Sequence, residues 1–298
     1  MSIDSTWLRC PNCFQDLSPV AEDGRTFGCT SGHRFDRSKY GFITLLPPGA
    51  PRTIGDDRAM LERRAALLGS GLYTPVMQQV AEAVRNRLTD TDRDRIDRND
   101  ESISLVDLGC GTGHYTRSLV AAVPAITRVA LTDRSPDAVR AAMRTVGTAA
   151  ESTGVVLDLW RPLPLRDGSA DVALDVFAPR NPDEFARVLR PGGALIVVVP
   201  TARHLTELRE AGAMLEIPDD KDAAVADRLG RSGFDLRASV RVDYTIEADP
   251  VAREWIIGMG PSARHGRQGD SVRREASGDD ADTLTVTVSV DVMTFQRP

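Results

Sequence analysis

Short apolar runs alternate with amphipathic stretches through the middle of the chain. Each run holds a few Val, Leu, Ile and Ala residues between Gly or charged residues, which is typical of strands buried in a parallel sheet. The stretches between them repeat their apolar positions at helical spacing. The alternation predicts an α/β domain. Its strands are expected at 105–108, 127–132, 155–159, 172–176 and 194–200, and its helices at 114–123, 138–146 and 182–189.

The ends of the chain predict further elements around this core. Two late segments, 236–246 and 284–295, alternate apolar and polar residues and predict antiparallel edge strands. Further helices are predicted at 56–68, 75–88, 204–209, 223–232 and 250–258. The charged stretch 89–102 predicts an exposed loop. Residues 258–282 predict a mobile segment, whose arginines fit either ordering on RNA or a plain surface loop.

The stretch 104–116, SLVDLGCGTGHYT, predicts a strand, a glycine-rich turn and the start of a helix. Glycines at alternate positions let backbone approach a ligand closely, although the same spacing also suits a purely structural turn. His114 stands where the dinucleotide-binding fingerprint has its last glycine. The pattern resembles instead the first motif of class I S-adenosylmethionine (SAM) methyltransferases. The predicted SAM site therefore contains Asp107, Gly109, Gly111, Gly113, His114 and Tyr115.

Two acids follow later strands of the predicted sheet. Asp133 comes about twenty residues after the glycine turn, where an acid binds ribose hydroxyls in Rossmann-like folds. Its alternative role is to cap the next helix, for which Ser135 is equally suited. Asp158 lies near the end of the third predicted strand and is a candidate acceptor for the adenine amino group.

The segment Val176–Pro182, VFAPRNP, follows the fourth predicted strand. Ligands bind at the carboxyl ends of strands in open α/β sheets, so Phe177 and Pro179 are placed where a flipped base can stack. The alternative is that Phe177 is a buried aromatic covering the sheet. Asp175 is a candidate for taking a proton from the substrate, unless strand alternation buries it.

Three of the four cysteines lie within the first thirty residues. Their spacing with His33 is C-x2-C-x15-C-x3-H, which favours a tetrahedral structural Zn²⁺ site over a redox pair or coincidence. The predicted ligands are Cys10, Cys13, Cys29 and His33. The proline- and glycine-rich segment 45–51 marks a boundary. We predict a zinc-binding module at 1–50, linker helices at 51–102 and a methyltransferase domain at 103–298.

Charge and hydropathy limit the kinds of partner that the protein can bind. A net charge of -6 argues against a uniformly basic, duplex-binding protein. The N-terminal segment is locally basic and aromatic, which suits looped RNA, although some of its rings are needed to pack the module. No signal peptide or membrane-length apolar run is present, so we expect a cytoplasmic protein. The residues of this surface are Arg9, Arg25, Arg34, Arg37 and Lys39 with Phe14, Phe27, Phe35, Tyr40 and Phe42.

Taken together, the cysteine–histidine segment, HRFDRSKYGFITLL, the glycine turn, VFAPRNP, LRPGG and MGP resemble one family. It is the RlmA family of bacterial 23S rRNA (guanine-N1)-methyltransferases. The Asn-Pro after VFAPR and the later GMGPSARH are most similar to its type II branch, which contains the tylosin- and mycinamicin-resistance enzymes. The resemblance implies a class I, Rossmann-like methyltransferase fold with a mostly parallel seven-stranded sheet and a small zinc-ribbon-like module.

The resemblance also implies a reaction and partners. The reaction is SAM-dependent methylation of N1 of a guanine in a hairpin loop of 23S rRNA near the macrolide-binding exit tunnel. The enzyme implied is a homodimer. Housekeeping modification and macrolide resistance are both open as roles. The rival hypotheses are a small-molecule methyltransferase, which leaves the zinc module unexplained, and a non-catalytic RNA-binding protein, which leaves Asp107 and the glycines unexplained.

Overall fold

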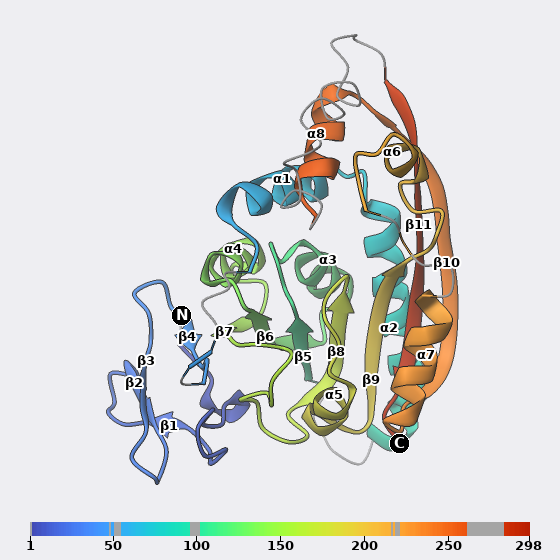
Figure 1. Ribbon diagram of the computed structural model, residues 1–298. Coiled ribbons are helices and arrows are strands. Elements are labelled where there is room, and N and C mark those ends of the chain that lie inside the picture. The colour runs from blue at the N-terminus through green and yellow to red at the C-terminus, as the bar shows by residue number, and fades with distance from the viewer. Residues whose placement is uncertain are drawn as a thin grey trace.

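The computed structural model describes residues 2–47, 49–50, 55–95, 102–215, 217, 221–260 and 283–298. A central sheet is covered on both faces, and a small β module lies at one edge of it (Figure 1). None of the described helices is long and apolar enough to cross a membrane. Of the segment 258–282 that was predicted to be mobile, residues 261–282, with all its arginines, lie outside the described residues.

The large sheet has the strand order β10-β11-β9-β8-β5-β6-β7-β4. At one edge β10 pairs antiparallel with β11, and β11 pairs antiparallel with β9, as expected for antiparallel edge strands; the remaining neighbours are parallel. The strands are β4 (Ile43–Thr44), β5 (Ile103–Leu108), β6 (Ile126–Asp133), β7 (Glu151–Val156), β8 (Ala170–Val176), β9 (Leu189–Pro200), β10 (Asp235–Ala248) and β11 (Leu284–Gln296).

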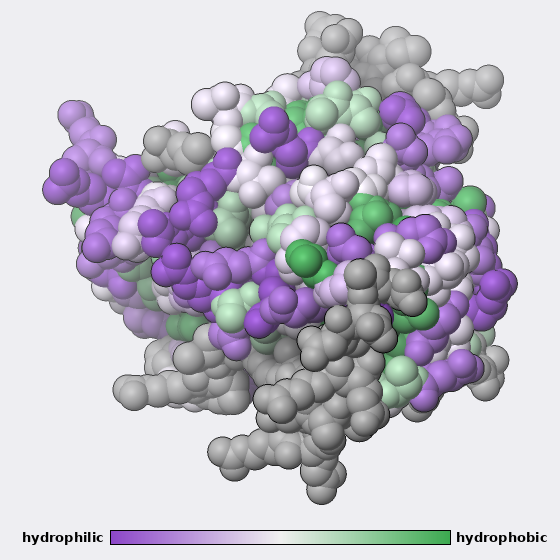
Figure 2. All heavy atoms as spheres, turned by 90° about the horizontal axis from the view of Figure 1, so that it is seen from above, coloured by the Kyte–Doolittle hydropathy of each residue, from purple (hydrophilic) through white to green (hydrophobic). Residues whose placement is uncertain are grey.

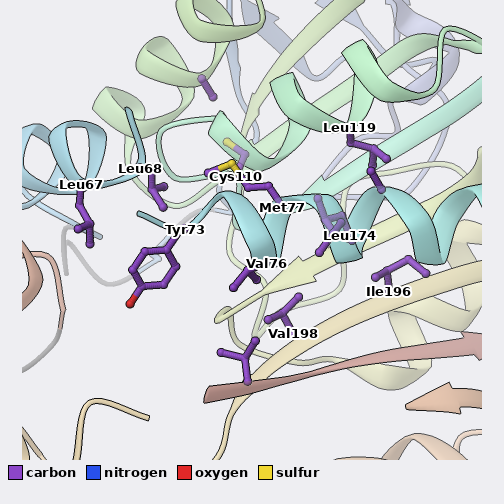
Figure 3. Packing of buried hydrophobic residues seen from close by; sticks show 14 of the residues in the cluster. Leu67, Leu68, Tyr73, Val76, Met77, Cys110, Leu119, Leu174, Ile196 and Val198 are labelled. Carbon is purple, nitrogen blue, oxygen red and sulfur yellow. The ribbon is translucent and has the colours of Figure 1, made fainter. Parts of the chain in front are cut away.

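Helices pack on the two faces through separate apolar cores. One core joins the sheet to α2, α3, α4 and α8, and Figure 3 shows Met77, Leu119, Leu174 and Ile196 gathered within it. The other joins the sheet to α5, α7 and the N-terminal module. The helices are α1 (Arg58–Gly69), α2 (Thr74–Arg95), α3 (His114–Ala122), α4 (Pro136–Val146), α5 (Pro182–Val188), α6 (Thr206–Glu210), α7 (Lys221–Arg231) and α8 (Pro250–Gly258).

Three sequence predictions are corrected by the fold. The segment 89–102 was predicted as a loop, but α2 continues to Arg95, because each residue added to a helix that is already formed gains one backbone hydrogen bond, even where Thr and Asp are weak helix formers. The strand predicted at 155–159 ends at Val156, which leaves Asp158 in the following loop. The seven predicted sheet strands are present, and β4 adds an eighth beside β7.

The N-terminal module contains a short 3₁₀ helix (Ser5–Trp7) and a three-stranded sheet of β1 (Ser18–Pro19), β2 (Thr26–Gly28) and β3 (Arg34–Asp36). Its buried side chains, among them Trp7, belong to the same apolar core as the sheet residue Val106. The Arg166 guanidinium donates from Nε to the Leu8 carbonyl over 3.0 Å. The module is therefore packed against the central sheet and shares an apolar core with it.

This shared core predicts that module and sheet unfold together. Trp7 is fully buried, so Trp7→Ala is expected to lower the free energy of unfolding by about 3–5 kcal/mol. Trp160, which is 66% exposed, is the matched control, and Trp160→Ala is expected to change it by less than about 0.5 kcal/mol. Denaturant unfolding followed by far-UV circular dichroism measures both. A separate early transition of the module in Trp7→Ala, with the main transition unmoved, would contradict the shared core.

Candidate functional site

The glycine-rich turn follows β5 and is fixed by its neighbour β6. Gly109, Gly111 and Gly113 all have positive φ, at 90°, 50° and 77°. Left-handed backbone is costly for residues with a Cβ, so glycine suits each position. The N–H groups of Gly109 and Cys110 both donate to the Thr132 carbonyl, over 2.9 and 2.8 Å. The turn thus has one defined shape.

Two of the three glycines also permit close packing. A Cβ on Gly109 would lie 2.7 Å from the Ala178 Cβ, and one on Gly113 would lie 2.7 Å from the Ala142 Cα of α4. These contacts bring the segment after β8 against the turn on one side and α4 against it on another. Gly111 is different, because the nearest atom to its Cβ position is a guanidinium nitrogen of Arg64, at 3.2 Å.

Asp133, at the end of β6, clamps the turn. Its Oδ2 accepts from the Gly111 N–H over 3.0 Å, and its Oδ1 accepts from the Ser135 N–H over 2.8 Å. The N-cap of α4 is Ser135, whose Oγ accepts from the Ala138 N–H, so Asp133 is not needed for that role. Burial raises the pKa of Asp133. Each carboxylate oxygen retains a lone pair for a ligand.

Asp107 lies beside the turn on the strand that precedes it. It is 3% exposed and accepts a hydrogen bond from the Thr116 hydroxyl of α3. Burial raises the pKa of Asp107 to about 7, with the nearby Asp133 charge acting in the same direction. A cation placed next to this pair would relieve both effects.

The other predicted cofactor residues differ in their surroundings. The ring Nδ1 of His114 is 2.9 Å from the Thr112 hydroxyl, and burial lowers the pKa of His114. The Tyr115 hydroxyl is buried and has no hydrogen-bond partner among the described residues. Asp158 is paired with Arg134 and also accepts from the Trp160 N–H over 3.1 Å, so its carboxylate already has two donors.

Arg64 reaches the turn from α1. The Arg64 side chain is only 24% exposed, so it does not lie on a solvated face of the helix. It pairs with Asp56 and donates from Nη2 to the Met259 carbonyl over 2.7 Å. No motif distinguishes Arg64 from Arg58 and Arg63, so only the fold could identify it as a neighbour of Gly111.

The segment after β8 presents one aromatic ring. Phe177 has a φ of 53° and is 42% exposed, which excludes the alternative of a buried cover for the sheet. Its ring stacks on His204, with ring centroids 6.0 Å apart and planes 24° apart. Pro179, two residues on, is also exposed.

Asp175 lies deeper than these residues. It is fully buried, and its Oδ1 is 3.4 Å from the Arg180 Nε. Burial raises the pKa of Asp175 to about 8, although the Arg180 charge acts the other way. Strand alternation puts it on the face of Ala173, opposite to Leu174 and its core. Strand alternation therefore buries Asp175, and its carboxylate is not accessible to a nucleobase.

The four predicted zinc ligands converge in the N-terminal module. Their ligand atoms all lie within 4.8 Å of one another. The Sγ atoms of Cys13 and Cys29 are 3.6 Å apart, and the His33 Nδ1 is 3.3–3.6 Å from the three sulfurs. Tetrahedral zinc, with bonds of about 2.3 Å to sulfur and 2.0–2.1 Å to nitrogen, requires edges of about 3.8 and 3.5 Å. The cluster fits Zn²⁺.

The basic and aromatic residues of the module are divided between structure and surface. Phe27 and Phe42 are buried, and Arg9 and Arg34 donate to backbone carbonyls. Phe14 lies under the Arg9 guanidinium and Phe35 packs against the core, whereas Tyr40 lies at a surface depression, with the Arg140 guanidinium of α4 3.9 Å from the centroid of its exposed ring. Figure 2 shows a mostly hydrophilic surface over the module, at the left of that view. The lining residues are Arg25, Arg37, Ser38, Lys39, Tyr40 and Gly41.

Two family models match separate parts of the chain. A family described as "RlmA, N-terminal", a zinc ribbon, matches residues 8–50, and one described as "Methyltransferase domain" matches residues 105–193. The first match spans the zinc cluster and β4. The second spans the glycine turn, Asp133 and the segment after β8.

Curated relatives extend the match to nearly the whole chain. A 23S rRNA (guanine(748)-N(1))-methyltransferase of Streptomyces fradiae is 37% identical, covering 95% of this chain and 96% of that protein. A putative 23S rRNA (guanine-N(1)-)-methyltransferase of Micromonospora griseorubida is also 37% identical, over 94% and 95%. A Bacillus subtilis protein with the same putative function, YxjB, is 29% identical over 88% of each chain. With its zinc ribbon and its SAM-binding methyltransferase fold, this chain belongs to the family of 23S rRNA (guanine-N1)-methyltransferases.

Proposed function

We propose that this protein transfers the methyl group of SAM to N1 of a guanine in a hairpin loop of 23S rRNA. One observation supports this most strongly: a glycine turn clamped by Asp133 lies beside an exposed stacking ring, Phe177, in a fold that carries a zinc module. Guanine 748 in the name of the Streptomyces fradiae relative supports the choice of target. The reaction takes place in the cytoplasm, where ribosomes are modified.

The residues around the turn suit the parts of SAM. Asp133 is assigned to the ribose hydroxyls, because each carboxylate oxygen keeps a free lone pair. Asp107 is assigned to the ammonium group, whose charge would offset the cost of burying the carboxylate. Gly109, Gly111, Gly113, His114 and Tyr115 form the wall around the cofactor, and Asp158 is assigned to the adenine side, acting together with Arg134.

The guanine is assigned to the exposed ring of Phe177, with Pro179 beside it. When bound, SAM supplies an electrophilic methyl group on a sulfonium, so this chain must hold the base in line and allow the N1 proton to leave. Asp175 is too deeply buried to touch the base, and we assign it to holding the loop through Arg180. Positioning is therefore the main contribution of these residues.

The module is assigned to the RNA outside the flipped base. Arg25, Arg37 and Lys39 can contact phosphates, and the exposed Tyr40 ring can stack on a base. We also propose a homodimer. The long edge strand β10, with Leu236 and Val240 exposed at 47% and 40%, supports an interface between copies at this edge.

The reaction is tested with tritiated SAM and unmodified 23S rRNA, followed by primer extension to locate the product. Methylation at guanine N1 blocks base pairing, so a new stop at one loop guanine, the equivalent of guanine 748, is expected. SAM binding without transfer to RNA would reject the proposed reaction, in favour of a small-molecule substrate or a non-catalytic role.

Removing the stacking ring is expected to separate methylation from cofactor binding. Phe177→Ala should lower the methylation rate about 5- to 100-fold, since stacking on an aromatic side chain is worth roughly 1–3 kcal/mol per base. SAM affinity should change by less than about twofold. Phe177→Tyr keeps a ring and is expected to retain most activity. Single-turnover methylation and calorimetry measure the two quantities, and undiminished methylation by Phe177→Ala would remove this residue from the site.

Asp133 is expected to show the opposite separation. Asp133→Ala should weaken SAM binding about 10- to 100-fold, because it removes charged hydrogen bonds to the ligand and frees the Gly111 N–H. The exposed Asp137 on the first turn of α4 is the matched control, and Asp137→Ala is expected to bind SAM like the wild type. Titration calorimetry decides, and equal affinity in both variants would defeat the assignment.

The zinc site is tested by metal content. The wild type is expected to hold about one Zn²⁺ per chain, and Cys29→Ser to lose it together with part of the fold. Cys110 lies at the glycine turn outside the cluster, so Cys110→Ala should retain the metal. Elemental analysis of the purified proteins measures this, and zinc retained in Cys29→Ser would disprove the ligand set.

A further inference from the structure

The Phe177 ring has two faces, and one of them is covered by a neighbouring side chain. Its inner face lies against the His204 ring, with centroids 6.0 Å apart and an interplanar angle of 24°. The residue is nevertheless 42% exposed, so the outer face is open. The Phe177 backbone is left-handed, with φ at 53°. Residues other than glycine adopt this conformation only when the surrounding structure holds them in it.

His204 is itself fixed from several sides. It is 6% exposed, and its Nδ1 accepts from the Ser289 N–H of β11 over 3.2 Å. Its ring meets Tyr73 edge to face, with centroids 6.3 Å apart and planes 80° apart. The backbone is held too, because the His204 N–H donates to the Thr201 carbonyl over 3.1 Å, and Arg209 donates to the His204 carbonyl over the same distance.

The strand behind His204 is braced by a chain of hydroxyl bonds. Thr201 donates from its hydroxyl to the Ser289 hydroxyl over 2.7 Å, and that hydroxyl in turn donates to the Asp243 carboxylate of β10 over 2.9 Å. The ring is thus tied to β11 and, through β11, to β10. A side chain held this firmly provides a fixed surface for whatever stacks on it.

The His204 ring is also neutral. Since the Ser289 N–H donates to Nδ1, that nitrogen carries no proton, and the proton of the neutral ring is on Nε2. Burial, together with the charges of Arg209 and Lys221, lowers the pKa of His204 to about 4. Its contribution at neutral pH is therefore a flat, uncharged ring.

We propose that His204 is the positioning residue for the base-stacking ring: it backs the inner face of Phe177, so that a flipped guanine can stack only on the outer face. His204 acts through Phe177 and need not touch the substrate. This inference rests on the proposed function, because it specifies how the base-binding surface of the same site is oriented. No sequence motif includes His204, and only the fold brings it beside Phe177.

The experiment separates the ring of His204 from its hydrogen bond. His204→Asn offers an oxygen to the Ser289 N–H but has no ring, whereas His204→Phe has a ring but no acceptor. Each is made in the wild-type and Phe177→Ala backgrounds. Single-turnover methylation of the unmodified 23S rRNA hairpin at saturating SAM gives the rate, calorimetry gives SAM affinity, and thermal unfolding checks the fold. If His204→Asn does not fold, His204→Leu against His204→Phe makes the same comparison.

His204→Asn, or His204→Leu in its place, is expected to lower the methylation rate about 10- to 100-fold, with SAM affinity within about twofold of the wild type. His204→Phe should stay within about threefold. In the Phe177→Ala background the same ring-removing change should cost less than about twofold, because the ring it supports is gone.

Equal losses in both backgrounds would overturn the inference, since His204 would then act independently of Phe177. Full activity of the ring-less variant would overturn it as well, while leaving the proposed reaction intact. A wild-type protein that binds SAM but does not methylate the hairpin would instead reject the proposed reaction, and the inference with it.

Discussion

The fit of a glycine turn between two neighbouring segments is the constraint on which this structure depends. The turn passes within van der Waals distance of Ala178 on one side and Ala142 on the other, and a Cβ on Gly109 or Gly113 would collide with them. The same tight passage sets the distance between the end of β5 and the segment after β8. The assigned cofactor wall and the assigned stacking ring are thereby held side by side, and Asp133 fixes the turn by accepting from the Gly111 N–H.

The order of the elements could be predicted because each depends on local sequence. Buried strands need continuous apolar runs, tight turns need glycine, and a metal site needs its ligands at fixed spacing, so the sheet core, the turn and the four zinc ligands were all visible in the chain. Side-chain environments depend on contacts between distant residues and were not visible. The pairing of Asp158 with Arg134 and the stacking of His204 on Phe177 are of this kind, whereas the burial of Asp175 follows from strand alternation.

Boundaries also depended on tertiary context. The two residues of β4 are too few to signal a strand, and they pair with β7 because the preceding module already lies against the sheet. The polar end of α2 at 89–95 is rich in Thr and Asp, which are weak helix formers, so its continuation to Arg95 reflects propagation from the packed turns before it. In both places the local pattern was weak, and the structure formed next to it decided the outcome.

The attachment of the module through β4 has a consequence for selectivity. A zinc ribbon on a flexible tether could search for many RNA shapes, but this one shares an apolar core and a strand pairing with the catalytic sheet. The distance between the surface around Tyr40 and the Phe177 ring is therefore fixed. An RNA bound at both surfaces must present its extruded base at that distance from its contact with the module. An rRNA hairpin bound at both surfaces, as proposed, would be selected by these dimensions, with few contacts to base edges.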